Sequence, residues 1–101
     1  MDMDNPLVYC IILSYNSANW LETCLDSLLK TNYDNYKILV IDNNSTDRSV
    51  EVLKKYLPKI EIIENNENSG WCEANNIAIK YAEKKGAKYV MLLNSDTKVT
   101  D

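Results

Sequence analysis

The chain has 101 residues, of which 46% are apolar and 26% charged, and its net charge is −4. This length fits one small domain, and the composition is ordinary for a globular protein. An acidic chain lacks the basic surface that non-specific nucleic-acid binding needs, so nucleic acid is not an expected partner. No apolar run approaches the length of a membrane span, and the first residues lack a signal-peptide pattern. We therefore expect a cytoplasmic protein.

The cysteine and histidine content narrows the possible chemistry. The three cysteines, Cys10, Cys24 and Cys72, are odd in number and too widely spaced for a zinc motif, so we expect reduced thiols. The chain contains no histidine. This excludes Ser-His and Cys-His catalysis within these residues, and it removes the commonest ligand of transition metals. A general base must be a carboxylate, a lysine or a tyrosine, or it must lie outside this chain.

Four runs rich in apolar and β-branched residues predict strands of a parallel sheet. They cover residues 7–13, 37–41, 60–64 and 89–93. The run at 60–64 begins with alternating apolar and charged residues, which suits an edge strand with one wet face. The run at 89–93 is almost continuously apolar, which predicts a strand that is buried on both faces.

Three segments with helical spacing separate these runs, at residues 18–30, 48–57 and 71–85. The first helix has an apolar stripe and begins after a cap at Ser17 or Asn19. The second is expected to be capped by a residue of 45–47 and to end at Pro58. The third has a packing face of mostly small side chains and ends at Gly86.

The order of these elements is β-α-β-α-β-α-β, which predicts an α/β fold with right-handed crossovers and a parallel sheet. Every loop that follows a strand is rich in Asn, Asp and Ser. These loops cover residues 14–17, 42–47, 65–70 and 94–97. Since the carboxyl ends of parallel strands share one edge of a sheet, the four loops should converge there, where such folds bind ligands.

Several side chains of these loops allow two interpretations. Residues 14–17 hold a planar ligand, or they form an ordinary strand-to-helix loop. Asp42 accepts hydrogen bonds from a base N–H or from ribose hydroxyls, or it is a solvated loop aspartate. Asn94 and Asp96 point the same way on an extended backbone, which suits a hard divalent cation, or Asp96 caps the next element. Gly70 suits a tight turn or a close approach to a ligand.

Missing motifs argue against other enzyme classes. The sequence has no phosphate-binding P-loop, and Gly70 has no companion glycines for a dinucleotide fingerprint. An Asn-x-Asp-Thr tetrad after a strand is also similar to the motif of aspartyl-phosphate hydrolases. Those enzymes need an aspartate nucleophile at the first position, where this chain has Asn94.

Taken together, the loop motifs resemble those of family 2 glycosyltransferases with the GT-A fold, in the family's order and spacing. The matching stretches are residues 11–16, 40–47, 68–70 with 74–76, and 92–97. The likeness is to the N-terminal half of such enzymes, in particular to rhamnosyltransferase-like members that build surface polysaccharide. It implies a three-layer α/β/α fold with a mostly parallel sheet. Residues 1–101 would be the part that binds the donor, without the acceptor-binding half.

The resemblance also implies roles for individual residues. Tyr15 would lie near the base of a nucleotide, and Asp42 and Asn44 would contact the base or the ribose. Asn76 matches the family's asparagine on the third helix. The full set of implied nucleotide-binding residues is Ser14, Tyr15, Asn16, Asp42, Asn44, Asn68, Gly70, Asn76, Asn94 and Ser95.

Residues 94–96 are the counterpart of the family's Asp-x-Asp motif. Asp96 would bind Mg²⁺ or Mn²⁺ that bridges the diphosphate of a nucleotide sugar. The first acid of the motif is replaced by Asn94. This amide would hydrogen-bond ribose or a metal-bound water rather than bind the metal directly.

The family inverts the anomeric centre through in-line attack by an acceptor hydroxyl. Its carboxylate base lies well after the Asp-x-Asp motif, so no catalytic residue is expected within this chain, and the chain alone should bind nucleotide weakly and transfer no sugar. The implied donor is a UDP- or dTDP-sugar, and the acceptor is a saccharide or lipid-linked saccharide. The full-length enzyme would be cytoplasmic or peripheral to the inner face of the membrane.

Two further expectations accompany this interpretation. A degenerate nucleotide-binding or assembly module without catalysis is the alternative function. An exposed edge at the fourth strand would favour self-association.

Overall fold

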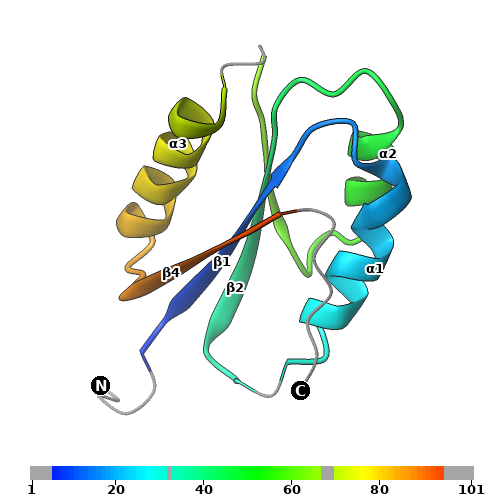
Figure 1. Ribbon diagram of the computed structural model, residues 1–101. Helices are drawn as coiled ribbons and strands as arrows, with labels where there is room; N and C mark the ends of the chain where they lie inside the picture. Colours follow the sequence, from blue (N-terminus) through cyan, green and yellow to red (C-terminus); the bar gives the residue numbers. More distant parts are fainter. Residues whose placement is uncertain (1–5, 32, 67–69, 95–101) are drawn as a thin grey trace.

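A computed structural model describes residues 6–31, 33–66 and 70–94 of the chain. Its centre is one sheet of four strands in the order β3-β2-β1-β4, and every neighbouring pair is parallel (Figure 1). The strands are β1 (Val8–Ser14), β2 (Tyr36–Asp42), β3 (Glu61–Glu64) and β4 (Tyr89–Asn94). The predicted α/β fold with a parallel sheet is confirmed.

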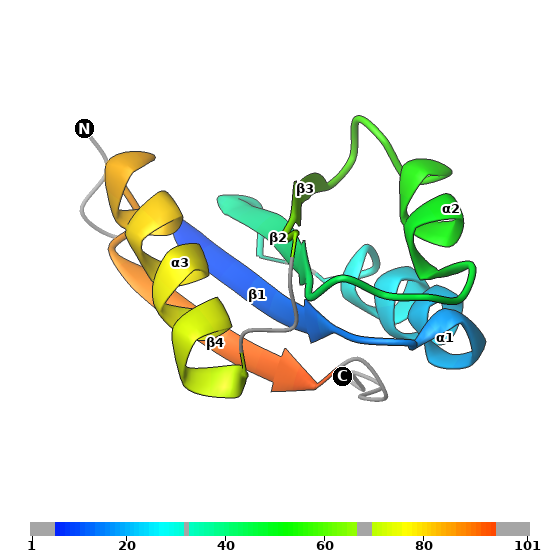
Figure 2. The ribbon, with the colours of Figure 1, turned by 90° about the horizontal axis from the view of Figure 1, so that it is seen from above.

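The helices α1 (Ala18–Leu28), α2 (Ser49–Lys54) and α3 (Trp71–Lys84) connect the strands. Figure 2 shows α3 on one side of the sheet and α1 with α2 on the other. The arrangement has three layers, as predicted. Among the described residues, no helix is long and apolar enough to cross a membrane.

Each face of the sheet has its own apolar core because successive residues of a strand point to opposite faces. On β1, Cys10 and Ile12 pack toward α1 and α2, whereas Tyr9, Ile11 and Leu13 pack toward α3. This explains why the strand is apolar from Val8 to Leu13. The α3 side is filled by three buried alanines, Ala74, Ala78 and Ala82. Their small side chains let the helix lie close to β1 and β2.

Two predictions about the elements need correction. The second helix was expected over residues 48–57 but ends at Lys54. From there the backbone N–H groups of Lys55, Tyr56 and Leu57 donate to the carbonyls three residues earlier, at 3.2, 3.0 and 3.4 Å. Pro58 disfavours helical geometry at the residue before it, so the chain turns early instead of continuing to the proline.

The prediction that the fourth strand is buried on both faces is wrong. Four of its residues, Tyr89, Val90, Met91 and Leu92, are 39–60% exposed. The strand lies at the edge of the sheet, and α3 packs mainly against β1 and β2. An apolar run identifies a strand, but only its place in the sheet determines how much of it is covered.

Candidate functional site

The loops that follow β1 and β2 are held together by a buried carboxylate. Asp42 is 1% exposed, and its oxygens accept hydrogen bonds from the Ser14 hydroxyl at 3.1 Å and the Ser45 hydroxyl at 2.7 Å. The backbone N–H of Ser45 donates to the same carboxylate at 2.9 Å. These bonds compensate for the loss of water around a buried charged group. Asp42 therefore sets the shape of the loop that follows it.

Asn16 ties the same two loops together from the β1 side. Its amide oxygen accepts hydrogen bonds from the backbone N–H groups of Thr46 at 2.7 Å and Asp47 at 3.3 Å. The backbone N–H of Asn16 donates to the Ser45 hydroxyl at 2.9 Å. The residue has a φ of 49°, a left-handed conformation that asparagine tolerates better than most residues. The amide oxygen of Asn16 is thus used to position the loop.

Asp47 joins the starts of α1 and α2. One carboxylate oxygen accepts from the N–H of Ser49 at 2.8 Å and from its hydroxyl at 2.5 Å. The other accepts from the N–H of Ala18 at 3.3 Å. Burial alone would raise the pKa of Asp47, but the hydrogen bonds from Ser49 and Ala18 outweigh it and lower the pKa below its usual range. The N-cap of α2 is Arg48, without a side-chain cap hydrogen bond, so the expected cap at 45–47 is wrong; Asp47 instead accepts from the first residue of the helix.

Two asparagines that were not predicted as site residues extend the network toward β3. Asn43 is buried, and its N–H donates to the Ser14 carbonyl at 2.8 Å. Its side-chain oxygen accepts from the Asn65 amide at 2.8 Å, while the N–H of Asn65 donates to the Asp42 carbonyl at 2.8 Å. The only sequence signal for these residues was the density of polar residues after each strand. This signal does not separate structural from exposed groups.

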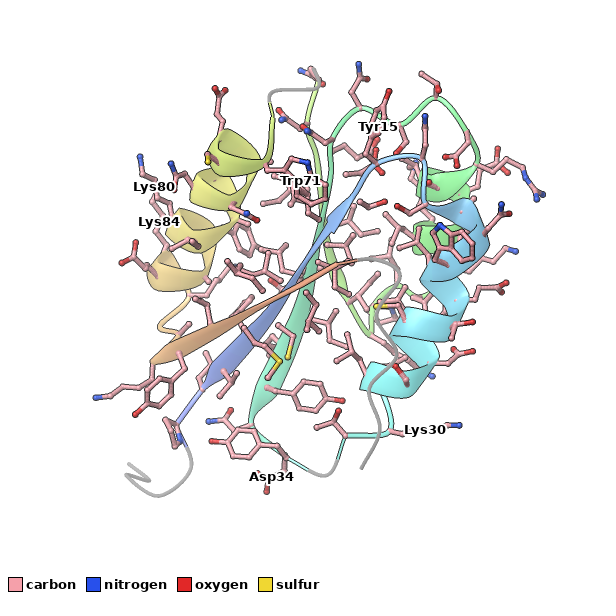
Figure 3. The ribbon with its side chains drawn as sticks, in the orientation of Figure 1. Tyr15, Lys30, Asp34, Trp71, Lys80 and Lys84 are labelled. Atoms are coloured by element: carbon pink, nitrogen blue, oxygen red, sulfur yellow. The ribbon has the colours of Figure 1, made fainter. Side chains whose placement is uncertain are left out.

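The predicted residues divide into buried and exposed groups at this edge. Ser14 and Asp42 are buried, whereas Tyr15, Asn16 and Asn44 are exposed. Asn44 has a φ of 63° on its exposed turn. Figure 3 shows Tyr15 above the carboxyl ends of the central strands. The exposed side chains are the ones that can meet a ligand directly.

Gly70 and Asn76 belong to α3 and the loop before it. Gly70 has a φ of 81°, where an L-residue would be strained, and apart from Gly70 and its two chain neighbours no described atom lies within 4 Å of where its Cβ would be. The glycine is therefore explained by the backbone turn rather than by a close neighbour. Asn76 is exposed on α3, two positions after the buried Ala74, and so faces away from the sheet.

A hollow of about 100 Å³ opens between α3 and the ends of β1 and β4. Its lining is formed by Leu13, Trp71, Asn75, Leu92 and Leu93. Asn75, rather than its predicted neighbour Asn76, thus lies beside the carboxyl edge of the sheet.

The remaining predicted residues belong to the end of β4 or lie outside the described residues. Asn94 ends β4 in register with Leu13 of β1, which places the start of the 94–97 loop at the same edge as the loops described above. Asn68, Ser95 and Asp96 lie outside the described residues. Within the part of the chain that the structure describes, no group of three His, Cys, Asp or Glu side chains is arranged to hold a metal. Asp42 and Asp47 are both engaged in hydrogen bonds within the loops.

Comparison with known proteins identifies the family. The family model described as "Glycosyl transferase family 2" matches residues 9–101. The chain belongs to glycosyl transferase family 2. One relative is WfgD of Escherichia coli, described as a UDP-Glc:alpha-D-GlcNAc-diphosphoundecaprenol beta-1,3-glucosyltransferase. It is 34% identical over 95 residues, which cover 93% of this chain and 36% of WfgD.

Solved structures agree with this family 2 assignment. The mannosyltransferase PcManGT of Pyrobaculum calidifontis, in complex with GDP-Man and Mn²⁺, has a TM-score of 0.88 and 24% identity over 98% of this chain and 30% of its own. At this identity the likeness shows the fold alone. TarS 1-349 of S. aureus with UDP-GlcNAc has a TM-score of 0.80 and 29% identity over 88% of this chain and 26% of its own.

The predicted GT-A fold is confirmed by these neighbours. The family 2 chain described here spans about a third of the length of the first curated relatives that it matches.

Proposed function

We propose that the chain is the donor-binding part of an inverting glycosyltransferase, which binds a nucleoside-diphosphate sugar with Mg²⁺ or Mn²⁺. The observation that carries this proposal is the carboxyl edge of the sheet. There the loops after β1 and β2 are pinned by Asp42 and Asn16, while Tyr15 and Asn44 are left exposed above them. Family membership, and a TarS structure that contains UDP-GlcNAc, support a nucleotide sugar as the ligand.

The exposed and buried residues take different roles in this proposal. Tyr15 stacks on the base, and Asn44 donates or accepts hydrogen bonds at the base or ribose. Ser14 and Asn16 support the pocket through the bonds that fix its loops. Asp42 has three of its roughly four acceptor directions filled, so a base N–H can take the fourth. Since only 1% of Asp42 is exposed, this contact requires its loop to shift.

The cation would be held by Asp96 together with the diphosphate of the donor. Oxygen ligands of this kind suit Mg²⁺ and Mn²⁺. When bound, the cation offsets the charge that develops on the departing nucleoside diphosphate. Asn68, Gly70, Asn94 and Ser95 complete the proposed set around the diphosphate and nucleoside. The proposal omits Asn76, because it faces away from the sheet.

The reaction that we propose is transfer of the sugar to a hydroxyl of a saccharide or lipid-linked saccharide, in the synthesis of surface polysaccharide. The name of WfgD, which specifies a diphosphoundecaprenol-linked substrate, supports this acceptor class. We also propose that the full-length enzyme is cytoplasmic or peripheral to the inner face of the membrane. The carboxylate that deprotonates the acceptor is proposed to lie outside these residues. We therefore expect the 101-residue chain alone to bind nucleotide without transferring sugar.

Calorimetric titration of UDP, with and without Mn²⁺, tests the donor site. We expect binding that Mn²⁺ strengthens in the wild type and a loss of this metal dependence in Asp96→Ala. Asp34→Ala is the control, since Asp34 is an exposed carboxylate in the segment between α1 and β2, at the opposite edge of the sheet. If neither UDP, dTDP nor GDP binds with Mn²⁺ present, the proposed function is wrong.

A non-catalytic nucleotide-binding or assembly module is the second candidate, and the amide at position 94 favours it. If Asn94 weakens metal binding, Asn94→Asp should strengthen UDP binding in Mn²⁺ and leave binding in EDTA unchanged. If Asn94→Asp does not increase the gain in UDP affinity that Mn²⁺ gives, the amide at position 94 does not weaken metal binding. This alternative then loses its support.

A further inference from the structure

The end of α3 and the turn after it carry a high density of positive charge. Residues 80–88 hold four lysines and one acid, although the whole chain has 11 basic and 15 acidic residues. All four lysines are exposed, and together they form the lysine patch, Lys80, Lys84, Lys85 and Lys88. The net charge of −4 already favours solubility, so these lysines are not needed for it.

Nearby carboxylates do not neutralise the lysine patch. Among the described residues, its Nζ atoms form no ion pair with a carboxylate, whereas Lys54 on α2 lies 4.0 Å from Glu64. Glu61 lies on the α3 face of β3, but it accepts hydrogen bonds from the Tyr9 hydroxyl at 2.9 and 3.2 Å. The lysine patch therefore presents its charge to the solvent.

The shape of the surface limits what the lysine patch can bind. Figure 3 shows Lys80 and Lys84 on the side of α3 that faces away from the sheet. They lie one helical turn apart and so share a face, and Lys88 follows in the segment that leads into β4. The hollow at the start of the same helix has no lysine in its lining. Charges that project from a helix suit a broad anionic surface, whereas a small ligand binds in a concave site.

The acidic remainder of the chain does not cancel this positive charge at a surface that meets α3. Charges in solution are largely screened beyond about 8 Å at physiological salt. The acids Glu22, Asp26 and Glu51 belong to α1 and α2, on the opposite side of the sheet (Figure 2), and α3 alone is about 10 Å across. Glu83 offsets one of the four lysines, and Glu73 lies in the first turn of α3, at its other end.

We propose that the lysine patch contacts the anionic headgroups of a membrane surface. The choice of partner rests on the proposed function, which gives the enzyme a lipid-linked acceptor. An anionic leaflet attracts lysines, and their long stems let the ammonium groups reach the headgroups. Contact through the outer side of α3 leaves the carboxyl edge of the sheet open, since Lys84 lies about 20 Å from Trp71 along a helix of 14 residues.

Co-sedimentation with vesicles tests this contact, using phosphatidylcholine vesicles with and without about 30% phosphatidylglycerol. We expect the chain to bind the anionic vesicles at about 0.1 M salt, to bind them less at about 0.5 M, and to bind the neutral vesicles little. Lys80→Gln combined with Lys84→Gln should weaken binding about 25-fold, because each lysine near the surface contributes about fivefold.

Lys55→Gln combined with Lys59→Gln is the matched control. It removes the same charge from exposed positions at and after the end of α2, on the other side of the sheet. This variant should bind the vesicles like the wild type. Both double variants should give the circular dichroism spectrum of the wild type and keep its affinity for UDP.

Equal losses in the two double variants would mean that net charge drives binding and would overturn the proposal. Equal binding to neutral and anionic vesicles would overturn it, as would no binding of the wild type to either. Tighter binding to polyglutamate than to vesicles of the same charge concentration would assign the lysine patch to an acidic protein instead. The assay contains no nucleotide, so its failure overturns the membrane contact alone. Failure of the nucleotides to bind in calorimetry overturns the proposed function and leaves the vesicle result to decide the membrane contact.

Discussion

At the scale of single residues, hydrogen bonds between distant loops determine what each polar group does. Asp42 and Ser14, two of the predicted nucleotide-binding residues, bond to each other across 28 residues of sequence. Tyr15, directly after Ser14, is 43% exposed. Adjacent residues at a strand end therefore take opposite roles, one within the protein and one toward solvent.

Removal of the Asp42 carboxylate should destabilise the fold. Asp42→Ala leaves the buried Ser14 hydroxyl without its acceptor and frees the Ser45 N–H. We expect the free energy of unfolding to fall by about 3 kcal/mol in urea denaturation. Asp34→Ala, at an exposed position, should change it by less than about 0.5 kcal/mol. A loss below about 1 kcal/mol for Asp42→Ala would mean that the network contributes little.

The lowered pKa of Asp47 predicts a pH dependence of stability. Because the folded-state pKa is depressed, the stabilisation is fully present above the unfolded pKa of about 4 and is lost as the pH falls through the folded value. Stability of the wild type, measured by urea denaturation from pH 6 to pH 2, should therefore decline more steeply below about pH 4 than that of Asp47→Asn.

Asp47→Ala provides the matched comparison, since it removes the acceptor as well as the charge. It should lower stability by about 1 kcal/mol near neutral pH, the usual net contribution of a hydrogen bond. Identical pH profiles for the wild type and Asp47→Asn would contradict the assignment.

At the scale of elements, α3 shows how side-chain size sets the spacing of a layer. Ala74, Ala78 and Ala82 recur at every fourth position and are fully buried against the sheet. Helical spacing predicted this packing face from the sequence. The flank of the same helix that carries Trp71 and Asn75 was not recognised, because it faces a gap beside β4 that only the assembled sheet creates.

Ala78→Leu should disturb this layer. The added carbons have no space between α3 and the sheet, and overpacking of this kind destabilises by about 1–3 kcal/mol. A fall in the thermal midpoint, measured by circular dichroism, would show it. Lys80→Leu adds an apolar side chain at an exposed position of the same helix and should leave the midpoint nearly unchanged. Similar midpoints for both variants would argue against close packing at Ala78.

At the scale of the whole molecule, the sheet order places β1 and β2 between the two helical layers and leaves β4 at an edge. All four strands are parallel and end at the same edge of the sheet, where the loops after β1 and β2 lie. The same arrangement exposes Tyr89, Val90, Met91 and Leu92. An uncovered apolar edge strand of this kind pairs readily with another chain.

We therefore expect the chain to self-associate through β4. Sedimentation velocity should show a dimer whose fraction rises with concentration. Met91→Lys should reduce it, because a charge on an edge strand opposes pairing. Leu57→Lys introduces the same charge at a similarly exposed apolar residue away from β4 and should leave the dimer intact. A wild type that stays monomeric at all concentrations would refute the prediction.

The sequence by itself determined the number, type and order of the elements and the edge of the sheet where the polar loops meet. Those features follow from local patterns, such as the apolar run of β1 and the alanines that recur every four residues on α3. The loop motifs also predicted the family, and the family comparison confirms this prediction.

Only the tertiary structure decided which loop residues are buried and which can meet a ligand. Asp42 accepts hydrogen bonds from Ser14 and from Ser45, and Asn16 accepts one from Thr46. Ser14 and Thr46 lie about 30 residues from their partners, and no local pattern specifies such contacts. The same holds for the exposure of β4 and for the choice of Asn75 over Asn76 beside the hollow. Burial depends on what lies on the far side of a side chain, and that neighbour comes from elsewhere in the sequence.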